Sequence, residues 1–271
     1  MVREYGPAMV RRADKVTLPE GSGNVWNEIS LAKLTAQPIT ENTEENNPQQ
    51  LADTLLSATP QVISVHTVVT DRADRNVSQN VISKIGTLGQ NAIERKKDID
   101  GLTLLDGATT SLGGAASVLT FGIVAAASYR ITGNATEPWM GDKSAILHSF
   151  QIKDLFDELT AGVGTSNITA GPTADVLKAG YDLPLAGVKI FSDDNITIDA
   201  SDDAKGGVFA SGKNGAVVLV QARNPWVKTI RNEKLGGGAT EVLHRDEYVW
   251  VERGGGVWLF EVYSDALAPT S

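Results

Sequence analysis

The sequence contains no cysteine among its 271 residues. This absence excludes disulfide bonds, thiolate catalysis and thiolate metal sites together. An assembly built from this chain would therefore draw its strength from side-chain packing, strand pairing or another kind of cross-link.

Basic residues are too few to outweigh the acidic ones. The chain has 24 Lys and Arg against 33 Asp and Glu, which gives a formal net charge of −9. Phosphate contacts dominate the affinity of nucleic-acid binders, so a net negative chain is a poor candidate for that class of protein. The net charge does help a concentrated protein to stay in solution.

The sequence also lacks a long hydrophobic run. Its most apolar window, residues 118–127, is too short to span a bilayer and contains Gly122. The first residues show no hydrophobic stretch of the kind found in secretory signals. Hydrophobic residues make up 41% and charged residues 21%, which suits one large globular domain or two modest ones. We expect a soluble protein made in the cytoplasm, without membrane contact.

The strong catalytic motifs are missing too. There is no phosphate-binding GxxxxGK followed by Ser or Thr, no GxGxxG after a strand, no HExxH and no GxSxG. The glycine runs at 236–238 and 254–256 are weak signals, because neither is followed by a helix that could hold phosphate. We therefore expect no enzyme, no catalytic residue and no cofactor.

Three histidines are present, and each stands alone in a predicted strand or at a strand end. They are His66, His148 and His244. A histidine in that setting is usually a hydrogen-bonded structural residue. A catalytic triad of Ser149, His148 and a distant aspartate is conceivable, but no other feature favours it.

A group of acidic residues raises the question of a metal site. Its members are Asp193, Asp194, Asn195, Asp199, Asp202 and Asp203. Hard oxygen ligands suit divalent cations, but the spacing lacks the central glycine and closing glutamate of an EF-hand. A solvated turn is the preferred interpretation, as it is for Asp98 and Asp100, so no metal is expected. Metal-dependent activity lost on Asp193→Ala and Asp194→Ala would favour a hydrolase instead.

The first 70 residues contain little that can bury itself. Residues 1–25 are polar, so we expect nothing in them to bury itself, and they form either a floppy terminus or an arm held by a neighbouring subunit. Residues 25–31 alternate apolar and polar side chains as a half-buried strand does, and residues 60–69 are rich in β-branched residues. With the polar stretch 40–48 between them, we predict one long hairpin, which would be marginal in isolation.

Residues 74–98 have the clearest helical pattern. The apolar face consists of Val77, Val81, Ile82, Ile85, Leu88, Ala92 and Ile93. Asp74 suits the N-cap, and the cations 95–97 suit the last turns. Gly86 and Gly89 each lower helix stability by about 1 kcal/mol relative to alanine, so something should pack closely on that side.

The remainder alternates helices and strands and then becomes mainly β. We predict a helix over 117–131, a strand over 144–148, a helix carrying Ile152 to Leu159, and a surface loop over 162–175. Short strands are expected at 188–191 and 196–198, and a buried strand at 216–220. Residues 248–253 and 256–263 should form an antiparallel hairpin around Gly254 and Gly255.

The order of these elements resembles that of the major capsid proteins of tailed bacteriophages, with the Hong Kong 97 fold that encapsulins share. Several stretches carry the likeness: 34–41 as the outgoing strand of an extended loop, 58–60 with 65–71 as its return, 98–102, 104–107 and 113–114 after the long helix, 145–151 with 154–155 as a strand-to-helix entry, and 216–223 with 246–263 as closing strands. Ser149 stands where the family more often has proline.

The resemblance implies an α+β, Hong Kong 97-type fold. Its parts would be an N-terminal arm (1–25), an extended loop (26–72), the spine helix with the first part of the peripheral domain (73–115), an axial domain (116–210) and closing peripheral strands (211–271).

It also implies a structural major capsid protein that assembles into an icosahedral head around double-stranded DNA. The partners would be copies of the chain in hexamers and pentamers, with scaffolding, portal and decoration proteins and non-specifically contacted DNA. The location would be the virion, after assembly in the host cytoplasm. We expect scaffolding to be a separate protein, because no extension precedes the arm. Mature subunits with a shortened N-terminus would contradict that expectation.

Two further readings remain open at this point. An encapsulin-type shell would enclose a cargo protein rather than a genome, and DNA inside purified particles would decide against it. A phage tail or decoration protein would also associate with itself, but electron microscopy would show tubes or small oligomers instead of closed shells.

Overall fold

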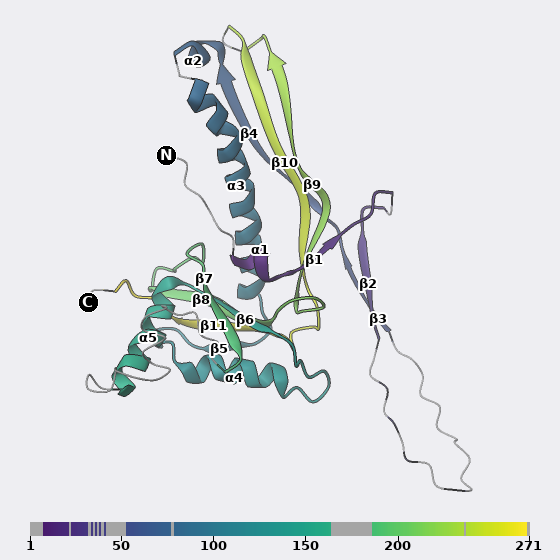
Figure 1. The fold of residues 1–271 in the computed structure, drawn as a ribbon, viewed down its shortest axis with the longest axis vertical. Helices are drawn as coiled ribbons and strands as arrows, with labels where there is room; N and C mark the ends of the chain where they lie inside the picture. The colour runs from purple at the N-terminus through teal and green to yellow at the C-terminus, as the bar shows by residue number, and fades with distance from the viewer. Residues whose placement is uncertain are drawn as a thin grey trace.

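The computed structural model describes residues 8–21, 23–31, 34, 36, 38, 41, 53–76, 79–163, 186–235 and 237–269. Within these residues the chain forms a tall four-stranded sheet lined by a long helix, a five-stranded sheet with helices at the lower end of that helix, and a two-stranded hairpin that projects away from both (Figure 1).

The tall sheet has the order β1 (Asp14–Thr17), β9 (Val217–Asn232), β10 (Ala239–Glu252) and β4 (Gln61–Thr70). β10 pairs antiparallel with both of its neighbours, and β1 pairs parallel with the first residues of β9. The short helix α2 (Asp71–Asn76) follows β4, and the long helix α3 (Gln79–Asp106) runs back along one face of the sheet (Figure 1).

The five-stranded sheet contains most of the hydrophobic core. Its order is β5 (Ser111–Gly113), β11 (Leu259–Asp265), β8 (Asp203–Ala210), β6 (Lys143–Leu147) and β7 (Val188–Ser192). The helices beside it are α4 (Phe121–Thr132) and α5 (Ser149–Val163) (Figure 1). The central strands are buried on both faces, so they form unbroken apolar runs such as Ala145-Ile146-Leu147.

The projecting hairpin consists of β2 (Trp26–Leu31) and β3 (Asp53–Ala58). This corrects the predicted pairing, in which 25–31 met 60–69. The second segment is a strand, β4, but its partner is β10. Pro60 lies between β3 and β4. Proline has no N–H to donate to a neighbouring strand, so strand pairing is interrupted where the chain passes from one sheet to the other. Of the predicted outgoing strand 34–41, residues 34, 36, 38 and 41 are described and none of these lies in a strand, while the loop tip lies outside the described residues.

The long helix differs from its predicted bounds at both ends. Asp74 lies inside α2 rather than at the N-cap of α3, and the helix continues to Asp106, so residues 95–97 are not in its last turn. Gly101 lies inside the helix. A side chain at this position would collide with Met9 and Trp250, so the close packing there requires glycine. The predicted apolar face is only partly correct, since Ile93 is fully buried while Leu88 is exposed.

Two predictions about the β-rich parts are wrong. Residues 196–198 form a single bridge, Ile198 to Ala204, rather than a strand. β10 and β11 belong to different sheets instead of one hairpin. The three glycines 254–256 all have positive φ, which lets the chain turn from one sheet into the other. The predicted strands at 144–148, 188–191 and 216–220 and the helices after 117 and 149 are confirmed, with shifted ends.

Candidate assembly surfaces

The projecting hairpin carries apolar side chains that the described chain leaves uncovered. Ile29 is 63% exposed and Leu55 is 61% exposed, and Leu31 is similarly open. Among the described residues, the base of the hairpin packs on the body, where Trp26 lies in one apolar cluster with Val218 and Val220 of β9. A two-stranded ribbon with apolar residues in solvent is marginal alone, so a further surface must cover it.

Arg253, just after β10, holds the base of this hairpin. Its Nε and Nη2 donate to the two carboxylate oxygens of Glu28 on β2, at 2.6 and 2.7 Å. Its Nη1 donates to Asp14 on β1 at 3.1 Å and to the carbonyl oxygen of Gly215 at 2.9 Å. One guanidinium therefore connects the N-terminal strand, the hairpin and the sheet.

The N-terminal segment is anchored, which corrects the expectation that nothing in residues 1–25 buries itself. Helix α1 (Ala8–Arg12) inserts Met9, which is fully buried, and Val10. The backbone N–H of Met9 donates to Asp98 on α3 at 3.1 Å, and that of Ala8 donates to Asp193 at 3.3 Å. The carboxylates satisfy N–H groups that a helix start leaves free.

The acidic residues singled out in the sequence have structural roles of this kind. Asp98 and Asp193 are buried, so the interpretation as solvated turns is wrong for both. Asn195 donates from Nδ2 to each of them, at 3.3 and 3.0 Å. In the described part of the chain, no three His, Asp or Glu side chains gather in a way that could hold a metal ion.

The rest of the acidic group also binds its own backbone or neighbouring hydroxyls. Asp194 accepts from the Oγ of Ser149 at the start of α5, and Asp199 accepts from the N–H of Asp203 at 3.0 Å. Asp203 is buried and accepts from the N–H of Ala116 at 2.8 Å, so the interpretation as a solvated turn is wrong for it too. Asp202 takes a positive φ of 61° in the turn before β8. These contacts shape turns.

The three histidines lie far apart in separate environments. His66 on β4 contacts Glu241 at 3.1 Å on the exposed face of the tall sheet. His148 accepts from the N–H of Phe150 through Nδ1 at 3.2 Å, and burial lowers its pKa below 6.5 despite the opposing effect of Asp194. His244 is buried between β10 and α3. Ser149 bonds Asp194 rather than the His148 ring, so no serine–histidine relay forms.

Sequence reasoning missed a polar interface between the long helix and the tall sheet. Lys97 is 4% exposed and forms an ion pair of 2.5 Å with Asp246, which is fully buried. Tyr248 donates to Asp100 at 2.8 Å, and Trp250 donates to the backbone oxygen of Lys97 at 2.8 Å. The alternation of Asp246, Tyr248 and Trp250 along one strand face was the available signal.

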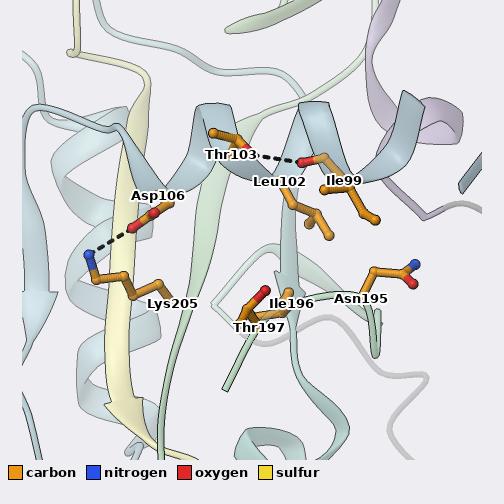
Figure 2. A pocket seen from close by; sticks show the side chains of 8 residues that line it. All are labelled: Ile99, Leu102, Thr103, Asp106, Asn195, Ile196, Thr197 and Lys205. Carbon is orange, nitrogen blue, oxygen red and sulfur yellow. Dashed lines mark hydrogen bonds and ion pairs between the residues drawn. The ribbon is translucent and has the colours of Figure 1, made fainter. Parts of the chain in front are cut away.

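Figure 2 shows a hollow between the end of α3 and the turn that follows β7. It measures about 100 Å³, well below the usual size of a small-molecule site. Its polar groups are already paired, because Lys205 contacts Asp106 at 2.7 Å and Thr103 donates to the backbone oxygen of Ile99 (Figure 2). The hollow holds no nucleophile with an adjacent base.

No helix in the described part of the chain is long and apolar enough to cross a membrane. No protein-family model matches the sequence, and no curated protein matches it either.

Solved structures do resemble the chain along nearly its whole length. The head structure of Helicobacter pylori bacteriophage KHP40 aligns with a TM-score of 0.73 and 12% identity over 98% of this chain and 94% of that one. The capsid structure of cyanophage P-SCSP1u gives 0.72 and 13% identity over 98% and 91%. Mycobacterium phage Che8 gives 0.68 and 18% identity over 89% and 85%. The predicted fold is thereby confirmed: this α+β chain has the Hong Kong 97-type fold of tailed-phage capsid proteins.

Proposed function

We propose that this chain is a major capsid protein, which assembles with copies of itself into the icosahedral head of a tailed bacteriophage around double-stranded DNA. The observation that carries the proposal is the match of nearly the entire chain to nearly entire phage capsid subunits. A likeness that left large parts of either chain unmatched would have fitted a shared domain with another task.

The uncovered hairpin supports the same proposal. Its apolar residues need a surface that the described residues do not offer, and a shell surrounds every copy with others. The shell would then be stabilised by many repeated contacts of modest strength. Asp98 and Asp193 are buried and both accept from the side-chain amide of Asn195, which supports a structural role rather than metal-dependent hydrolysis.

Within this proposal the parts take the names that the resemblance supplied. The tall sheet with α3 would be the peripheral domain, β2–β3 the extended loop, and the five-stranded sheet with α4 and α5 the axial domain. β11 pairs with β8, so we assign residues 259–265 to the axial part instead of the closing peripheral strands. Scaffolding, portal and decoration proteins, contact with packaged DNA and assembly in the host cytoplasm belong to the proposal as well.

Negative-stain electron microscopy of the purified chain tests it. Closed shells are the expected result; tubes or small oligomers would favour a tail or decoration protein, and a rigid monomer at high concentration would contradict a shell altogether. Particles recovered from infected cells should contain DNA, whereas a cargo protein in its place would indicate an encapsulin.

Deletion of residues 42–50 tests the hairpin as a contact arm. The deletion lies beyond the paired residues of β2 and β3, so the subunit should keep its far-ultraviolet circular dichroism and its melting temperature. Shell yield should fall strongly. Normal shells from the deleted chain would show that the hairpin tip makes no required contact.

A further inference from the structure

The outer edge of β4 has no partner among the described residues. β4 is the last strand of the tall sheet, and β10 pairs with it from Gln61 to Thr70 along one side only. In an antiparallel pair, about half of the N–H and C=O groups of an edge strand point away from the partner. These groups form a row that can accept another strand.

The composition of β4 offers no protection against such pairing. Its sequence, QVISVHTVVT, contains no Lys, Arg, Asp, Glu, Pro or Gly, and seven of its ten residues are β-branched. Edge strands of soluble proteins usually carry charges, proline or a bulge that prevent edge-to-edge association. An uncharged β-branched segment of this length is a hazard for aggregation unless another strand covers it.

The opposite edge of the same sheet is protected in several ways. β1 pairs with β9 over residues 218–221, and the exposed remainder of β9 carries Arg223, Pro225, Lys228 and Arg231. Proline removes a donor, and the cations would repel an approaching basic strand and stay hydrated. The described residues therefore block one edge of this sheet and leave the other open.

The side chains beside the open edge include valines on both faces of the sheet. The ring of His244 lies against Gly89 of α3, and Val65 is opposite His244 in the register, so the odd residues of β4 face the helix. Val62 and Val68 lie on the other face, and they are 55% and 42% exposed. An added strand would shield both valines while it satisfied the backbone.

Charge on β4 does not oppose a second copy of this chain as the source of that strand. Each copy carries a net charge of −9, so most pairs of surfaces from two copies repel one another. β4 has no formal charge between its ends, so a strand from another copy would meet no like charge on β4 itself. This step rests on the proposed function, because a shell holds copies side by side.

We propose that the outer edge of β4 accepts a strand from a second copy, so that the tall sheet continues from one subunit into the next in the assembled shell.

Hydrogen exchange on the purified chain, before and after assembly, tests this directly. Amides of 61–70 that exchange quickly in the unassembled subunit should slow by on the order of 100-fold in shells. Amides of 223–231 on the protected edge should change little. Shells whose β4 amides still exchange as in the subunit would overturn the strand pairing while leaving the proposed function intact. Protection seen only in particles that contain another protein would overturn the second copy as the partner.

A matched pair of substitutions gives an independent readout. Val62 on β4 and Val227, in the part of β9 beyond its pairing with β1, are both 55% exposed and lie at the two edges of one sheet. Val62→Lys should keep the subunit folded, because Glu247 lies opposite in the register, but should reduce shell yield about tenfold or more. Val227→Lys should assemble as the wild type does. Equal shell yields from the two variants would contradict the proposal, with circular dichroism and melting temperature confirming that both subunits fold.

Discussion

Arg253 and Glu28 join the end of β10 to the base of the projecting hairpin through two parallel hydrogen bonds of 2.6 and 2.7 Å. The guanidinium side chain is only 11% exposed, and it also contacts Asp14. Planar, two-point pairing fixes direction as well as distance, which a lysine cannot reproduce. The direction in which the hairpin leaves the body therefore depends on this residue.

Arg253→Lys should loosen the hairpin base and lower the free energy of unfolding by about 1–3 kcal/mol, because charged hydrogen bonds of Glu28 and Asp14 are lost. Urea denaturation measures the cost, and hydrogen exchange over 26–31 and 53–58 should quicken. Arg231→Lys is the control, since Arg231 also makes a two-point contact, with Asp71, but is 44% exposed. Its replacement should change stability little. Equal effects would show that burial does not matter at Arg253.

Gly86 and Gly89 of α3 should respond oppositely to alanine. A Cβ at Gly89 would come within 2.3 Å of the His244 ring, whereas at Gly86 it would meet nothing within 4 Å. Gly89→Ala should destabilise by about 1–3 kcal/mol through overpacking. Gly86→Ala should stabilise by about 0.5–1 kcal/mol through helix propensity. Chemical denaturation of both variants measures this, and a Gly89→Ala that costs nothing would show that His244 can move aside.

Lys97→Met should destabilise strongly, because it leaves the carboxylate of Asp246 buried without its ion-pair partner. A loss of about 3–5 kcal/mol is expected for breaking one side of a buried pair. Adding Asp246→Leu should recover part of it, since the double variant no longer buries an unpaired charge, although Gln221 and the N–H of Glu247 lose their acceptor. Lys153→Met, which breaks an exposed pair with Asp157, should have little effect. If the double variant were as unstable as the single one, packing rather than charge would explain the loss.

Periodicity was enough to find most of the strands and helices. The run Ala145-Ile146-Leu147 and the β-branched segment 61–70 form strands because local pattern and tertiary environment agree there. The partners of those strands could not be predicted in the same way. β4 meets β10 at positions such as Val65 and His244, far apart in the sequence, and local composition holds no information on that choice.

The anchoring of the N-terminal segment shows the same limit from another side. Residues 8–12 contain two buried apolar side chains in a polar stretch, which is too few for a periodic signal. Their docking depends on Asp98 and Asp193, two carboxylates from distant parts of the chain. The sequence predicts a solvated side chain for each of them. A buried carboxylate needs hydrogen-bond donors, and the N–H groups that supply them here can be identified only from the folded structure.

His148 should make the stability of the five-stranded domain depend on pH. Burial lowers its pKa below 6.5, with Asp194 and Asp193 acting in the opposite direction, and Nδ1 accepts the N–H of Phe150. As the pH falls through 6.5, His148 therefore binds a proton in the unfolded chain before it does so in the folded chain. The stabilising contribution is complete above pH 6.5 and falls as the pH drops toward the folded pKa, by about 1.4 kcal/mol for each unit of lowering.

His148→Asn isolates this effect, because an amide can still accept the N–H of Phe150 and does not titrate in this range. The wild type should lose stability relative to the variant between pH 7.5 and pH 5.5, as measured by urea denaturation at both values. Carboxylates such as Asp154, whose pKa burial raises, act in the opposite direction but are common to both proteins, so their contribution drops out of the difference. A difference that stayed constant, or that moved in favour of the wild type at pH 5.5, would mean that the folded site accommodates the protonated ring.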